Sequence, residues 1–148
     1  MAGTEPAPGS LLAVTASESG SVTLLDRASL QPVRTVAPPT ATASAVPMLV
    51  AEDAPRRVFY VTNFGGGLGR IPASAGAPSV LDLGGARSGL AISPDGRTLA
   101  VNGARDLTLR LVDLDAWRVA ASASFGDAAD APLHSHMTHG LASTHPIW

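Results

Sequence analysis

The chain has 148 residues, of which 45% are hydrophobic and 15% are charged, and its formal net charge is −2. This composition predicts a folded chain, and the small net charge disfavours nucleic acid and anionic lipid as partners. All ten basic residues are arginine and cysteine is absent, which excludes Schiff-base lysines, disulfides, thiolate nucleophiles and cysteine-ligated metal clusters.

Residues 1–10 form a segment rich in Gly, Pro and Glu, which we expect to be flexible. The segment lacks the positive charge and the apolar run of a signal peptide, and no stretch of the chain approaches 18 apolar residues. The sequence as written therefore predicts a cytoplasmic protein without a membrane partner.

One short strand pattern occurs three times from residue 11 onward. Its copies contain Val14, Val61 and Val101 at the same place, and these valines are 47 and then 40 residues apart. Repeats of about 40–45 residues are typical of the blades of a β-propeller.

A second strand recurs in register with the first. Residues 21–26 match residues 108–113, and Asp26 and Asp113 each lie 12 residues after the valine of their own copy. Apolar and polar side chains alternate in these strands, and no segment has a sustained 3.6-residue apolar period, so we expect an all-β chain. Both aspartates precede turns, where an Asp side chain commonly accepts hydrogen bonds from backbone amides.

Turn residues divide the strands into hairpins. Residues 93–96 (Ser-Pro-Asp-Gly) have the preferences of a type I turn and predict a hairpin between residues 90–92 and 98–101. A less regular hairpin is expected around residues 53–56, and the proline-rich residues 35–47 read as a loop between blades.

The middle copy is irregular, because Ala73 replaces the aspartate and the glycine-rich residues 65–69 replace the usual turn. Arg70 stands where a dinucleotide-binding fingerprint needs its last glycine, so we interpret residues 65–69 as a flexible blade loop. Trp117 aligns with Leu30 of the first copy, which predicts that its ring packs between blades.

Two motifs resemble the YVTN-type β-propeller repeats: Tyr60-Val61-Thr62-Asn63 and Ser93-Pro94-Asp95-Gly96-Arg97. The resemblance extends over residues 11–148 and implies an all-β, incomplete β-propeller of about three antiparallel blades. The blade-like repeats are expected at residues 11–37, 47–84 and 88–126, with the start of another at 139–148.

A closed ring of even four blades needs roughly 160–180 residues, so the chain is too short to close alone. Moreover, residues 140–143 (Gly-Leu-Ala-Ser) repeat residues 89–92 (Gly-Leu-Ala-Ile), which open a blade. Two explanations stay open: the chain is a fragment or truncated gene product, or copies assemble into a homo-oligomer that completes the ring.

All four histidines lie near the end of the chain, and His134, His136 and His139 are candidate ligands for a divalent metal. His139 occupies the repeat position of Ser88 and Met48, which borders the central channel in propellers resembling this one. The alternative is that these histidines, His145 included, are polar loop residues without a metal; Asp127 and Asp130 are the nearest carboxylates.

No complete catalytic set is visible, and no G-x-S-x-G motif marks a nucleophilic serine. The leading expectation is a non-enzymatic binding or scaffold module with no catalytic residues, no bound cofactor, and an unassigned protein or small molecule as partner. The alternative is a lactonase-like or metal-dependent oxidoreductase propeller that uses the histidine cluster. A third expectation is a truncated chain without a function of its own.

Overall fold

The structure, a computed structural model, describes residues 6–38, 45–85, 87–103 and 106–124. All regular structure in these ranges is β-strand, and none of it is a helix that could cross a membrane. The strands are β1 (Leu11–Ala16), β2 (Ser21–Asp26), β3 (Pro32–Val36), β4 (Pro47–Asp53), β5 (Val58–Asn63), β6 (Leu68–Pro72), β7 (Ser79–Leu81), β8 (Arg87–Ile92), β9 (Thr98–Gly103), β10 (Thr108–Asp113) and β11 (Arg118–Ser124).

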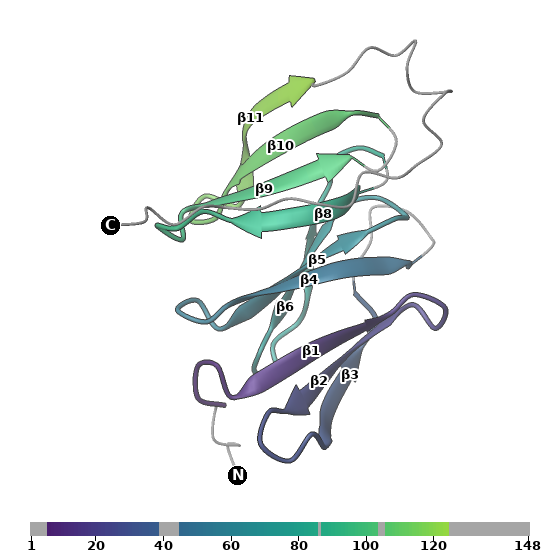
Figure 1. The fold of residues 1–148 in the computed structure, drawn as a ribbon, viewed down its shortest axis with the longest axis vertical. Helices are drawn as coiled ribbons and strands as arrows, with labels where there is room; N and C mark the ends of the chain where they lie inside the picture. The colour runs from purple at the N-terminus through teal and green to yellow at the C-terminus, as the bar shows by residue number, and fades with distance from the viewer. Residues whose placement is uncertain (1–5, 39–44, 86, 104–105, 125–148) are drawn as a thin grey trace.

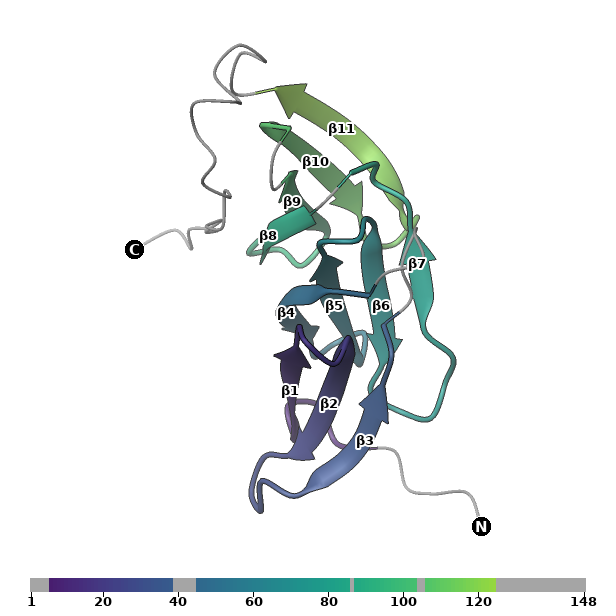
Figure 2. The ribbon, with the colours of Figure 1, turned by 90° about the vertical axis from the view of Figure 1, so that its right-hand side faces the viewer.

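The strands form three antiparallel sheets, which we call blades 1, 2 and 3. Their strand orders are β1-β2-β3, β4-β5-β6-β7 and β8-β9-β10-β11. Figure 1 shows the blades stacked side by side, and Figure 2 shows β1, β4 and β8 along one side of the stack with β3, β7 and β11 along the other. The expectation of an all-β chain with about three antiparallel blades is confirmed.

Blades 1 and 3 share one strand register at a sequence offset of 87 residues. Leu11 pairs with Asp26 in blade 1, and Thr98 pairs with Asp113 at the equivalent place in blade 3. The outer strand pair of each blade is also irregular at the same position, after Leu24 and after Leu111. By this register β1 corresponds to β9, the second strand of blade 3, and no described strand of blade 1 corresponds to β8.

The hydrophobic core lies between the blades in two clusters. The cluster between blades 1 and 2 consists of Leu11, Val22, Leu24, Val36, Phe59, Val61 and Ile71. The cluster between blades 2 and 3 consists of Tyr60, Leu68, Leu83, Leu90, Leu99, Val101, Val112 and Leu114. Each fully buried aliphatic side chain contributes about 1.5–3 kcal/mol to the stability of the fold. Because both clusters lie between blades, contacts between blades supply most of the stabilising apolar burial.

The predicted turn at residues 93–96 is confirmed, because the Gly96 amide donates to the Ser93 carbonyl at 2.8 Å. The expectation of a loop over residues 65–69 is wrong at its end: Leu68 and Gly69 are buried in β6, where Leu68 pairs with Thr62. Gly66 and Gly67, at φ values of 100° and 88°, allow the chain to reverse early enough for this pairing.

Candidate functional site

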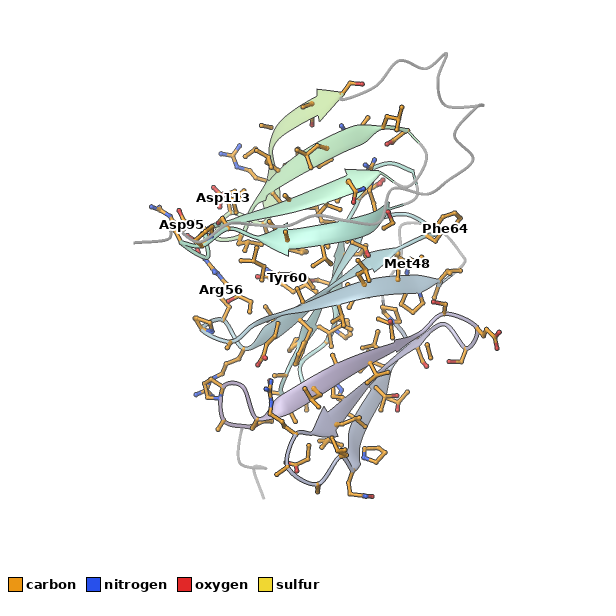
Figure 3. The ribbon with its side chains drawn as sticks, in the orientation of Figure 1. Met48, Arg56, Tyr60, Phe64, Asp95 and Asp113 are labelled. Atoms are coloured by element: carbon orange, nitrogen blue, oxygen red, sulfur yellow. The ribbon has the colours of Figure 1, made fainter. Side chains whose placement is uncertain are left out.

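Buried polar side chains gather at one end of the blades, where β4 and β8 begin and β5 and β9 end. Of the six buried polar or charged residues in the described ranges, five lie here: Thr62, Asn63, Arg87, Ser88 and Asn102. We call this the polar end. In Figure 3 it lies at the labels of Met48 and Phe64, whereas Arg56, Asp95 and Asp113 mark the opposite end.

A hydrogen bond between neighbouring blades recurs at the polar end. The Thr62 hydroxyl donates to the Ser88 carbonyl at 2.7 Å, and the Thr15 hydroxyl donates to the Met48 carbonyl at 3.0 Å. Each threonine follows the repeated valine of its blade, and each acceptor opens the first strand of the next blade. The bond therefore fixes the polar end of one blade against the next.

Asn63 organises the chain that enters and leaves blade 2. Its side-chain Oδ1 accepts hydrogen bonds from the amides of Val46 and Gly65, both at 2.9 Å. Its Nδ2 is buried and has no hydrogen-bond partner within the described part of the chain. Asn63 therefore holds the backbone before β4 and after β5 through Oδ1, and its buried Nδ2 donor lies next to the loops of the polar end.

Arg87 is fully buried and its guanidinium is used inside the fold. It donates to the carbonyls of Leu83, at 2.6 Å, and Gly84, to the Thr108 hydroxyl at 2.9 Å, and to the Asp106 carboxylate at 3.2 Å. Desolvation lowers the pKa of Arg87, and the negative charge of Asp106 opposes this shift. Arg87 thus joins the loop before β8 to the loop before β10.

The opposite end carries an open groove of about 430 Å³ between the β4–β5 and β8–β9 turns. Arg56 bridges blades 2 and 3 there, through the Asp53 carboxylate at 3.1 Å, the Gly96 carbonyl at 2.6 Å and the Asp115 carboxylate at 2.5 Å. The bond to Asp115 raises the pKa of Arg56. This role of Arg56 was not predicted, because its signal in the sequence is no more than an aspartate three residues before it.

Tyr60 reaches the same carboxylate from inside the interface. Its hydroxyl donates to Asp53 at 2.7 Å, and burial, followed by this hydrogen bond, raises the pKa of Tyr60. Asp53 is 4% exposed, and three donors, the Tyr60 hydroxyl and the guanidinium and backbone amide of Arg56, satisfy a carboxylate that would be costly to bury alone. The charged groups at the groove end therefore have a structural role, which is to hold blades 2 and 3 together.

The structural role predicted for Asp26 and Asp113 is confirmed. Asp26 accepts from the amide and hydroxyl of Ser29 at 2.8 Å, and Asp113 accepts from the Ala116 amide at 2.9 Å. These backbone hydrogen bonds are the main causes that lower the pKa of each carboxyl group.

The predicted metal ligands His134, His136 and His139 lie outside the described residues, as do Asp127, Asp130 and His145. The metal site therefore stays a prediction. The repeat equivalents of His139 are described, and both Ser88 and Met48 lie at the polar end.

Comparisons with known proteins give structural likeness alone. Hydrazine synthase from Kuenenia stuttgartiensis is 20% identical with a TM-score of 0.70, over 86% of this chain and 40% of that chain. The dihydro-heme d1 dehydrogenase NirN, in complex with DHE, is 23% identical with a TM-score of 0.66, over 80% of this chain and 26% of that chain. The chain has a β-propeller fold. It spans less than half of each of these two proteins.

No family model and no curated protein matches the chain. The YVTN-type repeat assignment therefore rests on the motifs in the sequence. At these identities the two propeller structures support the fold and carry no information about activity.

Proposed function

We propose that the chain is a non-enzymatic β-propeller module of the YVTN-repeat type, which binds a small molecule or a protein segment at its polar end. The observation that carries this proposal is the row of buried polar side chains held by hydrogen bonds between blades. The half-buried ring of Phe64 lies at the same end (Figure 3). Ligand sites commonly combine aromatic surface with a few fixed polar groups.

The two ends of the blades differ in a way that favours the polar end. At the groove end, Arg56 and Tyr60 satisfy the buried Asp53 carboxylate and connect two blades, which is a structural task. At the polar end, the buried Asn63 Nδ2 donor has no partner within the described residues and lies beside loops that differ between blades. Function in repeat folds commonly resides in such loops.

The proposal is tested by titrating the ¹⁵N-labelled chain with a library of small polar fragments and mapping the amide chemical shifts. We expect shifts at residues 63–67 and 87–89 of the polar end. Shifts confined to the turns at residues 53–57 and 93–97 would place binding in the groove and contradict the proposal. Catalytic turnover of any fragment would contradict its non-enzymatic part.

A second candidate is a lactonase-like or metal-dependent oxidoreductase propeller, with a divalent metal held by His134, His136 and His139. Its support is that Ser88 and Met48, which share the repeat position of His139, lie at the polar end. Stoichiometric metal in protein purified without a histidine tag, lost in the His136→Ala/His139→Ala double variant, would favour this candidate. Metal-free protein that stays metal-free after incubation with zinc would remove its support.

A further inference from the structure

The second residue after the repeated valine differs from blade to blade. It is Ala16 in blade 1, Asn63 in blade 2 and Gly103 in blade 3. At Gly103 an added Cβ atom would clash with Oδ1 of Asp106, so the Asp106 carboxylate takes the space of a side chain there. Of the three blades, blade 2 therefore presents an amide side chain at this place. Positions that vary on a repeated frame are where such folds commonly carry their function.

The orientation of the Asn63 amide follows from its partners. Its Oδ1 faces the backbone N–H groups of Val46 and Gly65, both at 2.9 Å, and an N–H group needs an acceptor opposite it. The reverse orientation would place Nδ2 against two other donors, so Nδ2 lies on the other side of the amide group. Asn63 is 0% exposed, and no group in the described part of the chain accepts a hydrogen bond from this Nδ2. Asn63 therefore holds a buried N–H donor in a direction that the fold fixes.

A second buried donor lies across one hydrogen bond between blades. Asn63 follows Thr62, Arg87 precedes Ser88, and the Thr62 hydroxyl donates to the Ser88 carbonyl at 2.7 Å. The Nε atom of Arg87 is buried and, among the described residues, has no hydrogen-bond partner. Both groups are donors, and a buried donor without an acceptor is destabilising. The chemistry that satisfies such a group is an oxygen acceptor.

The charges at the polar end favour an uncharged acceptor. The guanidinium of Arg87 lies 3.2 Å from the Asp106 carboxylate, so its positive charge already has a negative partner. The same guanidinium donates to the Leu83 carbonyl at 2.6 Å and to the Thr108 hydroxyl at 2.9 Å. The Asn63 amide is uncharged, and burial of a carboxylate beside it without a cation would be costly. The carbonyl oxygen of an amide or a ketone avoids that cost.

We propose that Asn63 is a specificity-determining residue of the polar end, whose Nδ2 donates a hydrogen bond to an uncharged carbonyl oxygen of the ligand. The inference rests on the proposed function and deepens it, because it names the chemical group that is recognised. Oδ1 keeps its two backbone partners when the ligand binds, so the chain before β4 and after β5 stays in place. The half-buried ring of Phe64, the next residue, supplies apolar surface at the same end (Figure 3).

The side-chain amide of Asn63 reports on this hydrogen bond directly in a ¹⁵N–¹H spectrum. The other side-chain amides of the chain are those of Gln31 and Asn102, so the signals are readily assigned. Three probes separate the chemistries: N,N-dimethylacetamide is an uncharged acceptor without an N–H group, acetate is a charged acceptor, and methylammonium only donates. We expect dimethylacetamide to shift the Asn63 side-chain signal in a saturable way, and the other two probes to shift it about threefold less. The exposed Gln31 amide is the internal control and should show no saturation.

Two results of this titration would overturn the inference: no shift of the Asn63 side-chain signal with dimethylacetamide, or an equal shift with acetate or methylammonium. The backbone signals of residues 63–67 and 87–89 distinguish this failure from failure of the proposed function. If they shift while the side-chain amide does not, the polar end binds a ligand and Asn63 does not select it. If no probe or fragment shifts them, binding at the polar end is itself wrong.

Asn63→Asp is the matched variant, because it keeps an oxygen for the amides of Val46 and Gly65 and replaces the N–H donor by a second oxygen. We expect its affinity for dimethylacetamide to fall about tenfold, as for the loss of one buried hydrogen bond. Gln31→Glu makes the same chemical change at an exposed side chain and should leave the affinity unchanged. Equal affinities of Asn63→Asp and the native chain would overturn the inference. The probe titration of the native chain decides the question even if this variant does not fold.

Discussion

Trp117 stacks on Tyr60 across the boundary between blades 2 and 3, with ring centroids 5.8 Å apart and ring planes inclined by 23°. The guanidinium of Arg70 lies 4.3 Å from the centroid of the Trp117 ring and adds a cation–π contact. Trp117 adopts a left-handed φ of 51°, as Leu30 does at 58° in the equivalent turn of blade 1. The same backbone turn therefore places the Trp117 side chain between blades in blade 3 and leaves the Leu30 side chain exposed in blade 1.

Trp117→Ala is expected to lower the free energy of unfolding by about 1–3 kcal/mol, because it removes the stack, the cation–π contact and apolar burial. The matched control is Leu30→Ala, since Leu30 is 60% exposed and has the same backbone conformation; its effect should stay within about 0.5 kcal/mol. Urea unfolding followed by circular dichroism measures both. Equal losses for the two variants would contradict the packing role of Trp117.

Thr62→Val tests the recurring bond between blades, because valine keeps the shape of threonine and removes its hydroxyl. Thr62 donates to the Ser88 carbonyl and accepts from the Leu49 amide at 3.1 Å, so both groups lose a partner. We expect a loss of about 1–3 kcal/mol, since an unsatisfied buried polar group costs that much. Thr15→Val should cost less than about 1 kcal/mol, because its bond is only partly buried and water can replace it. The reverse order would show that the bond does not hold the blades.

The lowered pKa values of Asp26 and Asp113 make the stability of the fold depend on pH. Hydrogen bonds from the backbone of Ser29 and Ala116 hold the pKa of these two carboxyl groups below the ordinary value of 3.8. As the pH falls, the unfolded chain therefore binds protons before the folded chain does. The stabilisation from these hydrogen bonds is complete above about pH 4 and is lost as the pH falls through the lower pKa values of the folded chain. The Asp26→Asn/Asp113→Asn double variant should lose less stability than the native chain between pH 5 and pH 2.5. If urea titrations show that the native chain and the double variant lose the same stability over this pH range, the prediction is wrong.

Asp106→Asn tests the charge that faces the buried Arg87. The change removes a carboxylate 3.2 Å from the guanidinium, and hydrogen bonds to charged groups contribute about 1.5–3 kcal/mol. Because Asp106 is 42% exposed, we expect the loss to be about 1–2 kcal/mol. Asp82→Asn is the control: its carboxylate accepts from the Gly84 amide in the same region and is exposed. An equal effect of the two substitutions on the urea midpoint would contradict the role of Asp106.

The repeated strands, the turn at residues 93–96 and the interblade position of Trp117 could be predicted from the sequence, because each depends on local pattern or on repeat alignment. The Arg56 bridge could not, since its partner Asp115 lies 59 residues away and belongs to no recognised motif. Arg87 was missed for a similar reason. Burial of an arginine depends on the carbonyls of a folded loop, which hydrophobic periodicity does not reveal.

The start of β6 directly after Gly66 and Gly67 was also not predicted. Gly66 and Gly67 resemble loop residues in composition, yet their left-handed conformations make a tight reversal possible and allow β6 to begin at Leu68. Glycine content alone therefore does not distinguish a flexible loop from a short turn between paired strands.

Ligand binding at the polar end is the central claim, and the amide chemical shifts of the ¹⁵N-labelled chain test it most directly. The measurement is a titration with small polar fragments. We expect shifts at residues 63–67 and 87–89, where the buried polar side chains lie. Shifts confined to the turns at residues 53–57 and 93–97, around the groove at the opposite end, would contradict the claim.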